Sequence, residues 1–143
     1  MLTKTLIAGG ALMLLAACVS APEPHPLEGI EWQLAEINTP GSTTRLTPPL
    51  QARHTLAFGP EGVLTLQLDC NRGRSTWSAD KPRNGAGALT IGPVASTRML
   101  CPEPSFGNQL ASLAEAKTYA LTLDRRELVI ETGTLRYTFA ARQ

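Results

Sequence analysis

Asp69-Cys70-Asn71-Arg72-Gly73 and Thr97-Arg98-Met99-Leu100-Cys101 are the two stretches on which the fold of this chain depends. They contain both cysteines that lie outside the amino-terminal leader. No other part of the sequence places so many rare residue types in so few positions. We therefore interpret the two stretches as a staple that joins the end of a strand to a distant segment.

A β-hairpin is predicted immediately before the first stretch. His54 to Phe58 and Val63 to Leu68 alternate apolar with polar residues, and Gly59-Pro60-Glu61-Gly62 between them has turn composition. A slip of one residue would move all three leucines of the second strand into water. The hairpin register is therefore strongly specified, and Cys70 falls at the end of the second strand.

The remaining chain is predicted to form short strands and one helix. The helix is expected from Glu103 to Lys117, where apolar residues recur at intervals of three and four, with Pro104 near its start and Ser105 as its cap. The segments from Thr39 to Pro49 and from Ala79 to Gly87 are expected to be loops. Period-two alternation places further strands at Glu31 to Ile37, Arg74 to Ser78, Ala88 to Ile91, Val94 to Thr97, Tyr119 to Leu123, Glu127 to Glu131 and Leu135 to Ala140.

These elements indicate an α+β domain of about eight antiparallel strands, whose sheet curls around the helix or around itself. The chain has 143 residues, of which about 125 would remain after removal of a leader, the usual size of one domain. No strand–helix–strand alternation and no Gly-rich phosphate loop is found in the sequence. A formal net charge of +1 gives no basis for binding nucleic acid.

The amino-terminal leader has the features of a signal peptide that ends in a lipidation site. Lys4 precedes an apolar run from Leu6 to Ala17 that is too short to span a bilayer comfortably. Leu15-Ala16-Ala17-Cys18 resembles the lipobox of bacterial lipoproteins, which implies cleavage before Cys18 and attachment of fatty-acyl chains, such as palmitate, at that residue. An ordinary secretory peptide, with Cys18 incidental, is the alternative.

We expect residues 1–17 to be the signal peptide, 18–26 a lipidated, proline-rich tether, and 27–143 the folded domain. The protein would thus contact a membrane only through its anchor at Cys18. Lipoprotein sorting rules retain proteins with Asp after the lipidated Cys at the inner membrane, and this chain has Val19 there. The expected location is therefore the bacterial envelope, at the outer membrane and facing the periplasm.

The motifs of the domain resemble those of the META domain of HslJ-type heat-shock lipoproteins. The resemblance rests on Trp32-Gln33-Leu34, Asp69-Cys70-Asn71-Arg72, Trp77, Leu89-Thr90-Ile91-Gly92 and Thr97-Arg98-Met99-Leu100-Cys101, in that order. It implies a curved antiparallel sheet, similar to a cracked barrel, packed with one helix. It further implies a role linked to envelope stress or antibiotic tolerance, without an established enzymatic activity or a cofactor.

This chain departs from the family's pattern at two positions of the first cysteine loop. Members often have Gly just before the first cysteine, where this chain has Asp69, and an aromatic residue at the position of Gly73. Both departures concern the local backbone rather than the fold.

Cys70 and Cys101 allow three interpretations. A structural disulfide is favoured, because the leader directs the chain to an oxidising compartment and two cysteines remain once Cys18 carries lipid. A redox or nucleophilic role would require a lowered thiol pKa. A metal site would be incomplete with two cysteines and no paired histidine motif, so no metal is expected.

A binding surface is expected, if anywhere, beside these cysteines. The candidate residues for this rim are Asn71, Arg72, Arg74, Arg98 and Trp77. Asn71 is interpreted first as a turn residue, and Trp77, like Trp32, first as packing.

The two histidines, His25 in the tether and His54 at a strand start, are interpreted as surface residues. No catalytic residue, metal or cofactor is predicted.

The leading functional hypothesis is a non-enzymatic envelope lipoprotein that binds or supports an unknown envelope protein or small ligand. One alternative is a thiol-active enzyme that uses Cys70 or Cys101. The other is a small barrel that holds an apolar ligand against residues such as Leu66, Leu121 and Phe139.

Overall fold

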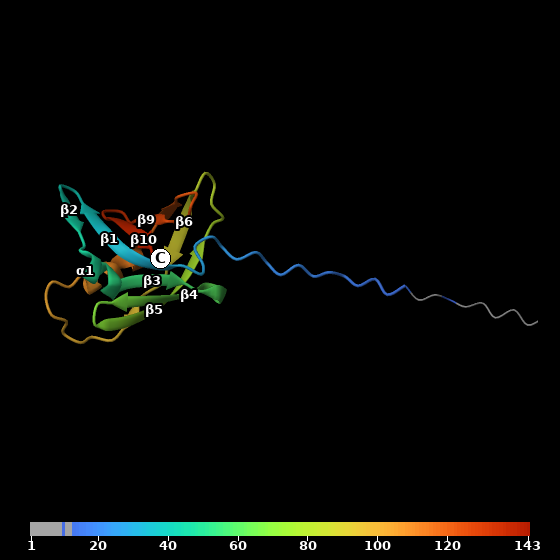
Figure 1. Ribbon diagram of the computed structural model, residues 1–143, viewed down its shortest axis with the longest axis horizontal. Helices are drawn as coiled ribbons and strands as arrows, with labels where there is room; N and C mark the ends of the chain where they lie inside the picture. The colour runs from blue at the N-terminus through green and yellow to red at the C-terminus, as the bar shows by residue number, and fades with distance from the viewer. Residues whose placement is uncertain (1–9, 11–12) are drawn as a thin grey trace, which may run out of the picture.

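The computed structural model describes residues 10 and 13–143, which fold into a closed antiparallel β-barrel with a chain segment that leaves it at one side (Figure 1). Eight of its ten strands close the barrel in the order β1-β3-β4-β5-β6-β8-β9-β10, and β2 and β7 pair with β1 and β5. The strands are β1 (Glu31–Thr39), β2 (Ser42–Arg45), β3 (His54–Phe58), β4 (Val63–Leu68), β5 (Asn71–Ala79), β6 (Ala86–Ile91), β7 (Ala95–Ser96), β8 (Thr118–Leu121), β9 (Glu127–Glu131) and β10 (Arg136–Ala141). The helical elements are α1 (Pro48–Arg53), η1 (Pro60–Gly62), α2 (Gly107–Ala111) and η2 (Ser112–Glu115).

The first and last strands close the sheet. β1 pairs antiparallel with β10 from Trp32 opposite Ala141 to Asn38 opposite Arg136, with a register shift between Leu34 and Glu36. A bulge of this kind bends a strand and increases its twist, as barrel closure requires. The predicted curled antiparallel sheet of about eight strands with a helix is confirmed.

The β3–β4 hairpin has the predicted bounds and register. His54 pairs with Leu68 and Phe58 with Leu64. All three leucines of β4 point into the barrel, where they belong to one continuous apolar core. The largest fully buried side chains of this core are Trp32, Tyr119, Tyr137, Phe58, Phe139, Leu27, Leu34, Leu56, Leu64, Leu89, Leu110 and Leu113.

The prediction of a long helix from Glu103 to Lys117 is wrong in extent. The chain forms only α2, followed by the 3₁₀ turn η2, which together bury Leu110 and Leu113 in the core. Ser105 does not cap this helix, since Phe106 holds the capping position and makes no side-chain cap. The residues between Cys101 and α2 form no helix and instead connect the disulfide to the barrel wall.

A close approach between α2 and β4 explains where the helix begins. A Cβ atom on Gly107 would lie 2.8 Å from the carbonyl oxygen of Leu68. Glycine therefore lets α2 pack directly on the end of β4.

The expected loop from Thr39 to Pro49 is also partly wrong, because it contains β2 and the start of α1. Gly41, with φ of +91°, turns β1 back into β2. Pro48 occupies the first turn of α1, where its missing N–H costs nothing. Glycine and proline therefore mark the starts of two short elements, β2 and α1, and the segment is not one continuous loop.

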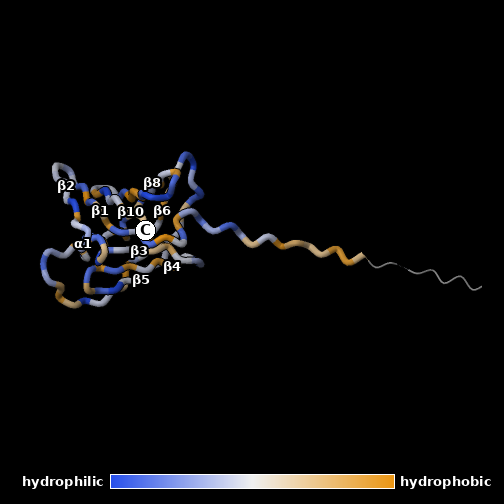
Figure 2. Tube along the Cα trace, viewed as in Figure 1, coloured by the Kyte–Doolittle hydropathy of each residue, from blue (hydrophilic) through white to orange (hydrophobic). Residues whose placement is uncertain are grey.

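The leader prediction lies largely outside the described residues, which omit 1–9 and 11–12. Residues 13–24 carry no helix or strand and run away from the barrel (Figure 1). Figure 2 shows that part of this segment is hydrophobic. None of the helices in the described part of the chain is long and apolar enough to cross a membrane.

Candidate functional site

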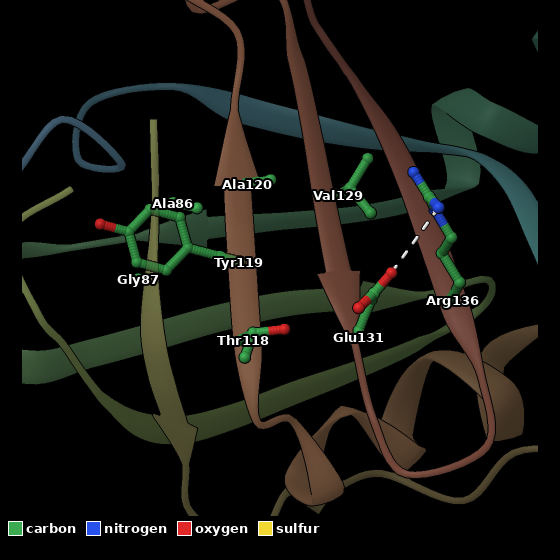
Figure 3. Close-up of a pocket in the computed structure, with 8 residues that line it drawn as sticks. All are labelled: Ala86, Gly87, Thr118, Tyr119, Ala120, Val129, Glu131 and Arg136. Atoms are coloured by element: carbon green, nitrogen blue, oxygen red, sulfur yellow. Dashed lines mark ion pairs between the residues drawn. The ribbon is translucent and has the colours of Figure 1, made fainter. Parts of the chain in front are cut away.

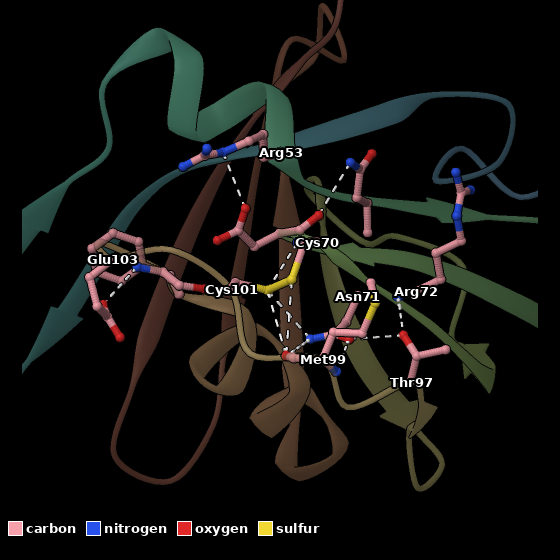
Figure 4. The surroundings of a disulfide bond; sticks show 12 residues. Arg53, Cys70, Asn71, Arg72, Thr97, Met99, Cys101 and Glu103 are labelled. Carbon is pink, nitrogen blue, oxygen red and sulfur yellow. Dashed lines mark hydrogen bonds and ion pairs between the residues drawn. A yellow bond between two sulfur atoms is a disulfide. The ribbon is translucent and has the colours of Figure 1, made fainter.

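A disulfide joins Cys70, in the turn between β4 and β5, to Cys101, in the segment of residues 92–106 (Figure 4). We call this segment the disulfide loop. The two Cα atoms lie 5.6 Å apart, within the usual range for a disulfide. Cys18 is exposed and is the free cysteine of the described residues.

The Asn71 side chain holds the disulfide loop by the backbone of Met99. Its amide nitrogen donates to the Met99 carbonyl oxygen at 2.9 Å, and its amide oxygen accepts from the Met99 N–H at 2.7 Å. This arrangement imitates the paired hydrogen bonds of a strand. The interpretation of Asn71 as a turn residue is therefore wrong, because its side chain fixes a distant segment.

Thr97 provides a second attachment of the disulfide loop. Its hydroxyl donates to the Asn71 amide oxygen at 3.0 Å and accepts from the Arg72 N–H at 3.0 Å. The Thr97 N–H donates to the Arg72 carbonyl oxygen at 3.1 Å, next to the short pairing of β7 with β5. The loop is thus fixed to β5 by a short ladder, a side-chain network and a disulfide.

Asp69 holds the tight turn before Cys70. Its φ of +62° lies in the left-handed region that favours glycine and that Asp tolerates better than most residues. The Asp69 carboxylate forms an ion pair with the Arg53 guanidinium, with Oδ1 and Nε 3.2 Å apart. The Asp69 N–H donates to the Arg53 carbonyl oxygen. Both contacts connect the turn to the end of α1. Its second carboxylate oxygen has no hydrogen-bond partner among the described residues.

His54 is fully buried, so the prediction of a surface histidine is wrong. Its Nε2 accepts from the Phe106 N–H at 3.0 Å, which leaves Nδ1 to donate to the Leu50 carbonyl oxygen at 2.6 Å. The ring also packs edge-to-face with Phe106. The alternation of His54 with Leu56 and Phe58 could have revealed its inward position. His54 thereby links α1 to the end of the disulfide loop.

His25 is also more than an exposed tether residue. Its ring packs edge-to-face on Trp77 and on Tyr119, with centroids 5.6 Å away in both cases. Its Nε2 lies 2.9 Å from the Asp80 carbonyl oxygen, which also accepts from the Tyr119 hydroxyl at 2.6 Å. Burial, and to a smaller extent the Asp80 charge, raise the pKa of Tyr119 and keep this donor protonated.

The predicted rim residues divide between the two sides of the β5 wall. Arg72 and Arg74 point outward and are exposed, and Arg98 is exposed on the disulfide loop. Trp77 points into the barrel, where its Nε1 donates to the Gly59 carbonyl oxygen at 3.0 Å and its ring packs on Phe58. The structure therefore places Asn71 beside the disulfide, Arg72 and Arg74 on the outer face of β5, Arg98 on the disulfide loop and Trp77 in the core.

A comparison with protein families shows to which family this chain belongs. The family model described as META domain matches residues 25–143. The chain belongs to the META domain family. No curated protein matches it.

Solved structures share the fold of this META domain at low sequence identity. An NMR structure of a protein from Burkholderia xenovorans has a TM-score of 0.59 and 18% identity, over 92% of this chain and 98% of that one. A second NMR structure has a TM-score of 0.54 and 23% identity, over 82% and 95% of the two chains. The crystal structure of a DUF4847 family protein from Bacteroides vulgatus has a TM-score of 0.53 and 15% identity, over 80% and 93%.

Two shallow grooves lie on the wall of the META domain barrel. The larger, of about 460 Å³, runs over β6, β8, β9 and β10 and ends at the ion pair of Glu131 with Arg136 (Figure 3). The smaller, of about 220 Å³, runs over β3, β4 and β5. Leu66, Leu121 and Phe139 are packed within the continuous core, so the lining suggested for an internal apolar ligand is occupied by side-chain packing.

No group of three or more His, Cys, Asp and Glu residues that could hold a metal ion occurs in residues 10 and 13–143. The candidate site in this META domain is the disulfide loop, with exposed arginine side chains on the loop and on the outer face of β5.

Proposed function

We propose that this protein is a lipid-anchored binding module of the bacterial envelope and not an enzyme. The proposal rests on the difference in bonding and exposure among the three cysteines. Cys70 and Cys101 are joined, whereas Cys18 is exposed at the end of Leu15-Ala16-Ala17-Cys18, on a segment outside the barrel. A thiol placed there is accessible to an acylating enzyme, and two or more acyl chains give stable membrane attachment.

The non-catalytic part of the proposal is supported by the use of the reactive side chains. The thiols of Cys70 and Cys101 are consumed in a disulfide, and both ring nitrogens of His54 are engaged by backbone groups. A thiol nucleophile needs a free thiolate with an available base, and neither is offered beside the disulfide. The resemblance to HslJ-type lipoproteins adds the expectation that binding matters under envelope stress.

The anchor is tested in a Gram-negative host that produces the full chain with and without the Cys18→Ser substitution. We expect the unchanged chain to incorporate an alkyne analogue of palmitate and to sediment with outer membranes. Cys18→Ser should lose all of the label. Val19→Asp is the matched control, and it should keep the label and move to the inner membrane. Palmitate label on the Cys18→Ser variant would contradict the proposal.

A further inference from the structure

The disulfide loop exposes two adjacent apolar side chains. Met99 is 61% exposed and Leu100 is 98% exposed. Within residues 25–143, Leu123 is the other large apolar side chain with comparable exposure. Figure 2 shows hydrophobic residues on this loop at the periphery of the molecule, away from the core.

The backbone that carries this apolar pair is held by hydrogen bonds and by the disulfide. Asn71 binds both the N–H and the carbonyl group of Met99, and the disulfide follows two residues later. Ordering a loop has an entropic cost, and exposed residues such as Met99 and Leu100 do not recover it through burial. Since Met99 and Leu100 are turned away from the core, the attachments fix the direction of these side chains in advance. Such preorganisation raises affinity for a partner.

Exposed arginines on the loop and on the neighbouring strand β5 define the chemistry of that partner. Arg98 adjoins Met99, and the backbones of Arg72 and Arg74 pair with Thr97 and with β7. In the described part of the chain, these three arginines make no ion pair. Arginine beside an exposed apolar anchor is typical of the centre of protein interfaces. A complementary surface would combine carboxylates with an apolar depression.

The location of the loop favours a protein partner over a bilayer. The segment that leads to Cys18 leaves the barrel at one side, and the disulfide loop lies at the opposite side (Figure 1). Arg125 marks the tether side, because its guanidinium donates to the carbonyl oxygens of Pro26 and Glu28. A protein anchored through Cys18 would therefore present the loop away from its own membrane.

We propose that Met99 and Leu100, with Arg72, Arg74 and Arg98, form a docking surface for an acidic segment of another envelope protein, into which the apolar pair inserts. This proposal rests on the envelope-anchored binding function proposed above, and it adds the surface and the partner's chemistry.

The test places a photo-crosslinking residue at Leu100 in the full, anchored chain, as Leu100→p-benzoylphenylalanine, and irradiates intact cells. The matched control is Leu123→p-benzoylphenylalanine, since Leu123 is equally exposed on the turn beside the tether. We expect a protein adduct at Leu100 whose crosslinked peptide, sequenced by mass spectrometry, contains Asp or Glu beside apolar residues. The same adduct should be at least tenfold weaker at Leu123.

A charge reversal makes the test specific for the arginines. Arg72→Glu, Arg74→Glu and Arg98→Glu together should reduce the Leu100 adduct at least tenfold, whereas Arg126→Glu should leave it unchanged. Equal thermal melting of the variants shows that each is folded. An adduct with lipid only, a crosslinked peptide without acidic residues, or an adduct that survives the reversal would overturn the docking surface. Loss of palmitate label and of outer-membrane location would instead overturn the proposed function, so the two failures are distinguishable.

Discussion

The β3–β4 hairpin and the disulfide loop are stabilised in different ways. The hairpin buries one face in the core, and its alternating leucines fix its register. The loop contributes Val94 and Phe106 to the edge of the core but leaves Met99 and Leu100 in solvent. A disulfide and the hydrogen bonds of Asn71 and Thr97 determine its shape. Burial of apolar side chains thus stabilises the barrel, whereas the disulfide and polar side-chain contacts fix the conformation of the loop.

The largest expected effect comes from truncation of the barrel core. Trp32 is fully buried at the pairing of β1 with both β3 and β10. Trp32→Ala should lower the free energy of unfolding by about 3–5 kcal/mol, because it removes buried surface and leaves a cavity. Urea unfolding of the purified protein measures this effect. A loss below about 1 kcal/mol would mean that the closure of the barrel does not depend on this packing.

Removal of the disulfide should have a slightly smaller effect. Cys70→Ala with Cys101→Ala opens a loop with a sequence separation of 31 residues, which the chain-entropy model values at roughly 3.5 kcal/mol. The same urea measurement applies, and the matched control is Cys18→Ala, which should leave the unfolding curve of the domain unchanged. An unchanged unfolding curve for the double variant would show that the disulfide does not stabilise the domain.

Replacement of His54 tests the connection between the two regions. His54→Phe keeps a ring in the core but leaves the Phe106 N–H and the Leu50 carbonyl oxygen without their partner. A buried polar group without a partner costs about 1–3 kcal/mol, and because both hydrogen bonds are only partly buried, thermal and urea unfolding should show a total loss of about 1–3 kcal/mol. His25→Phe, at the half-buried histidine, is the control and should cost less.

The smallest expected effect is at the apolar pair of the loop. Leu100→Ser should change the free energy of unfolding by no more than about 0.5 kcal/mol, because the side chain is already exposed. Leu64→Ser, in the same assay, should be strongly destabilising, since Leu64 is fully buried. If the two substitutions were equally damaging, Leu100 would be a core residue and not a surface anchor.

The sequence pattern was informative wherever the barrel wall has one face in water. β4 and β10 follow period-two alternation because each buries one face, whereas β9 buries three consecutive residues, Leu128, Val129 and Ile130. The spacing of Phe106, Leu110 and Leu113 indicated a long helix, but two short turns satisfy the same spacing. Helical spacing reports which residues are buried and not how far a helix continues.

The structure of the candidate site depended on contacts between distant segments. Asn71 reaches Met99 only because the barrel and the disulfide bring β5 and the loop together. His54 lies on the inward face of its strand, and its partners are residues that no local pattern connects to it. The pairing of Cys70 with Cys101, by contrast, is predicted by the oxidising compartment that the leader leads us to expect and by the number of cysteines.

Backbone order at Met99 tests the central claim most directly, that the loop is fixed in advance to present its apolar pair. We expect a ¹⁵N order parameter near 0.85 for the Met99 amide, as in rigid backbone, in the native disulfide-bonded protein. In Cys70→Ala with Cys101→Ala it should fall below about 0.6, while the Leu66 amide in β4 stays rigid. A flexible Met99 in the native protein, or a rigid one without the disulfide, would contradict the account.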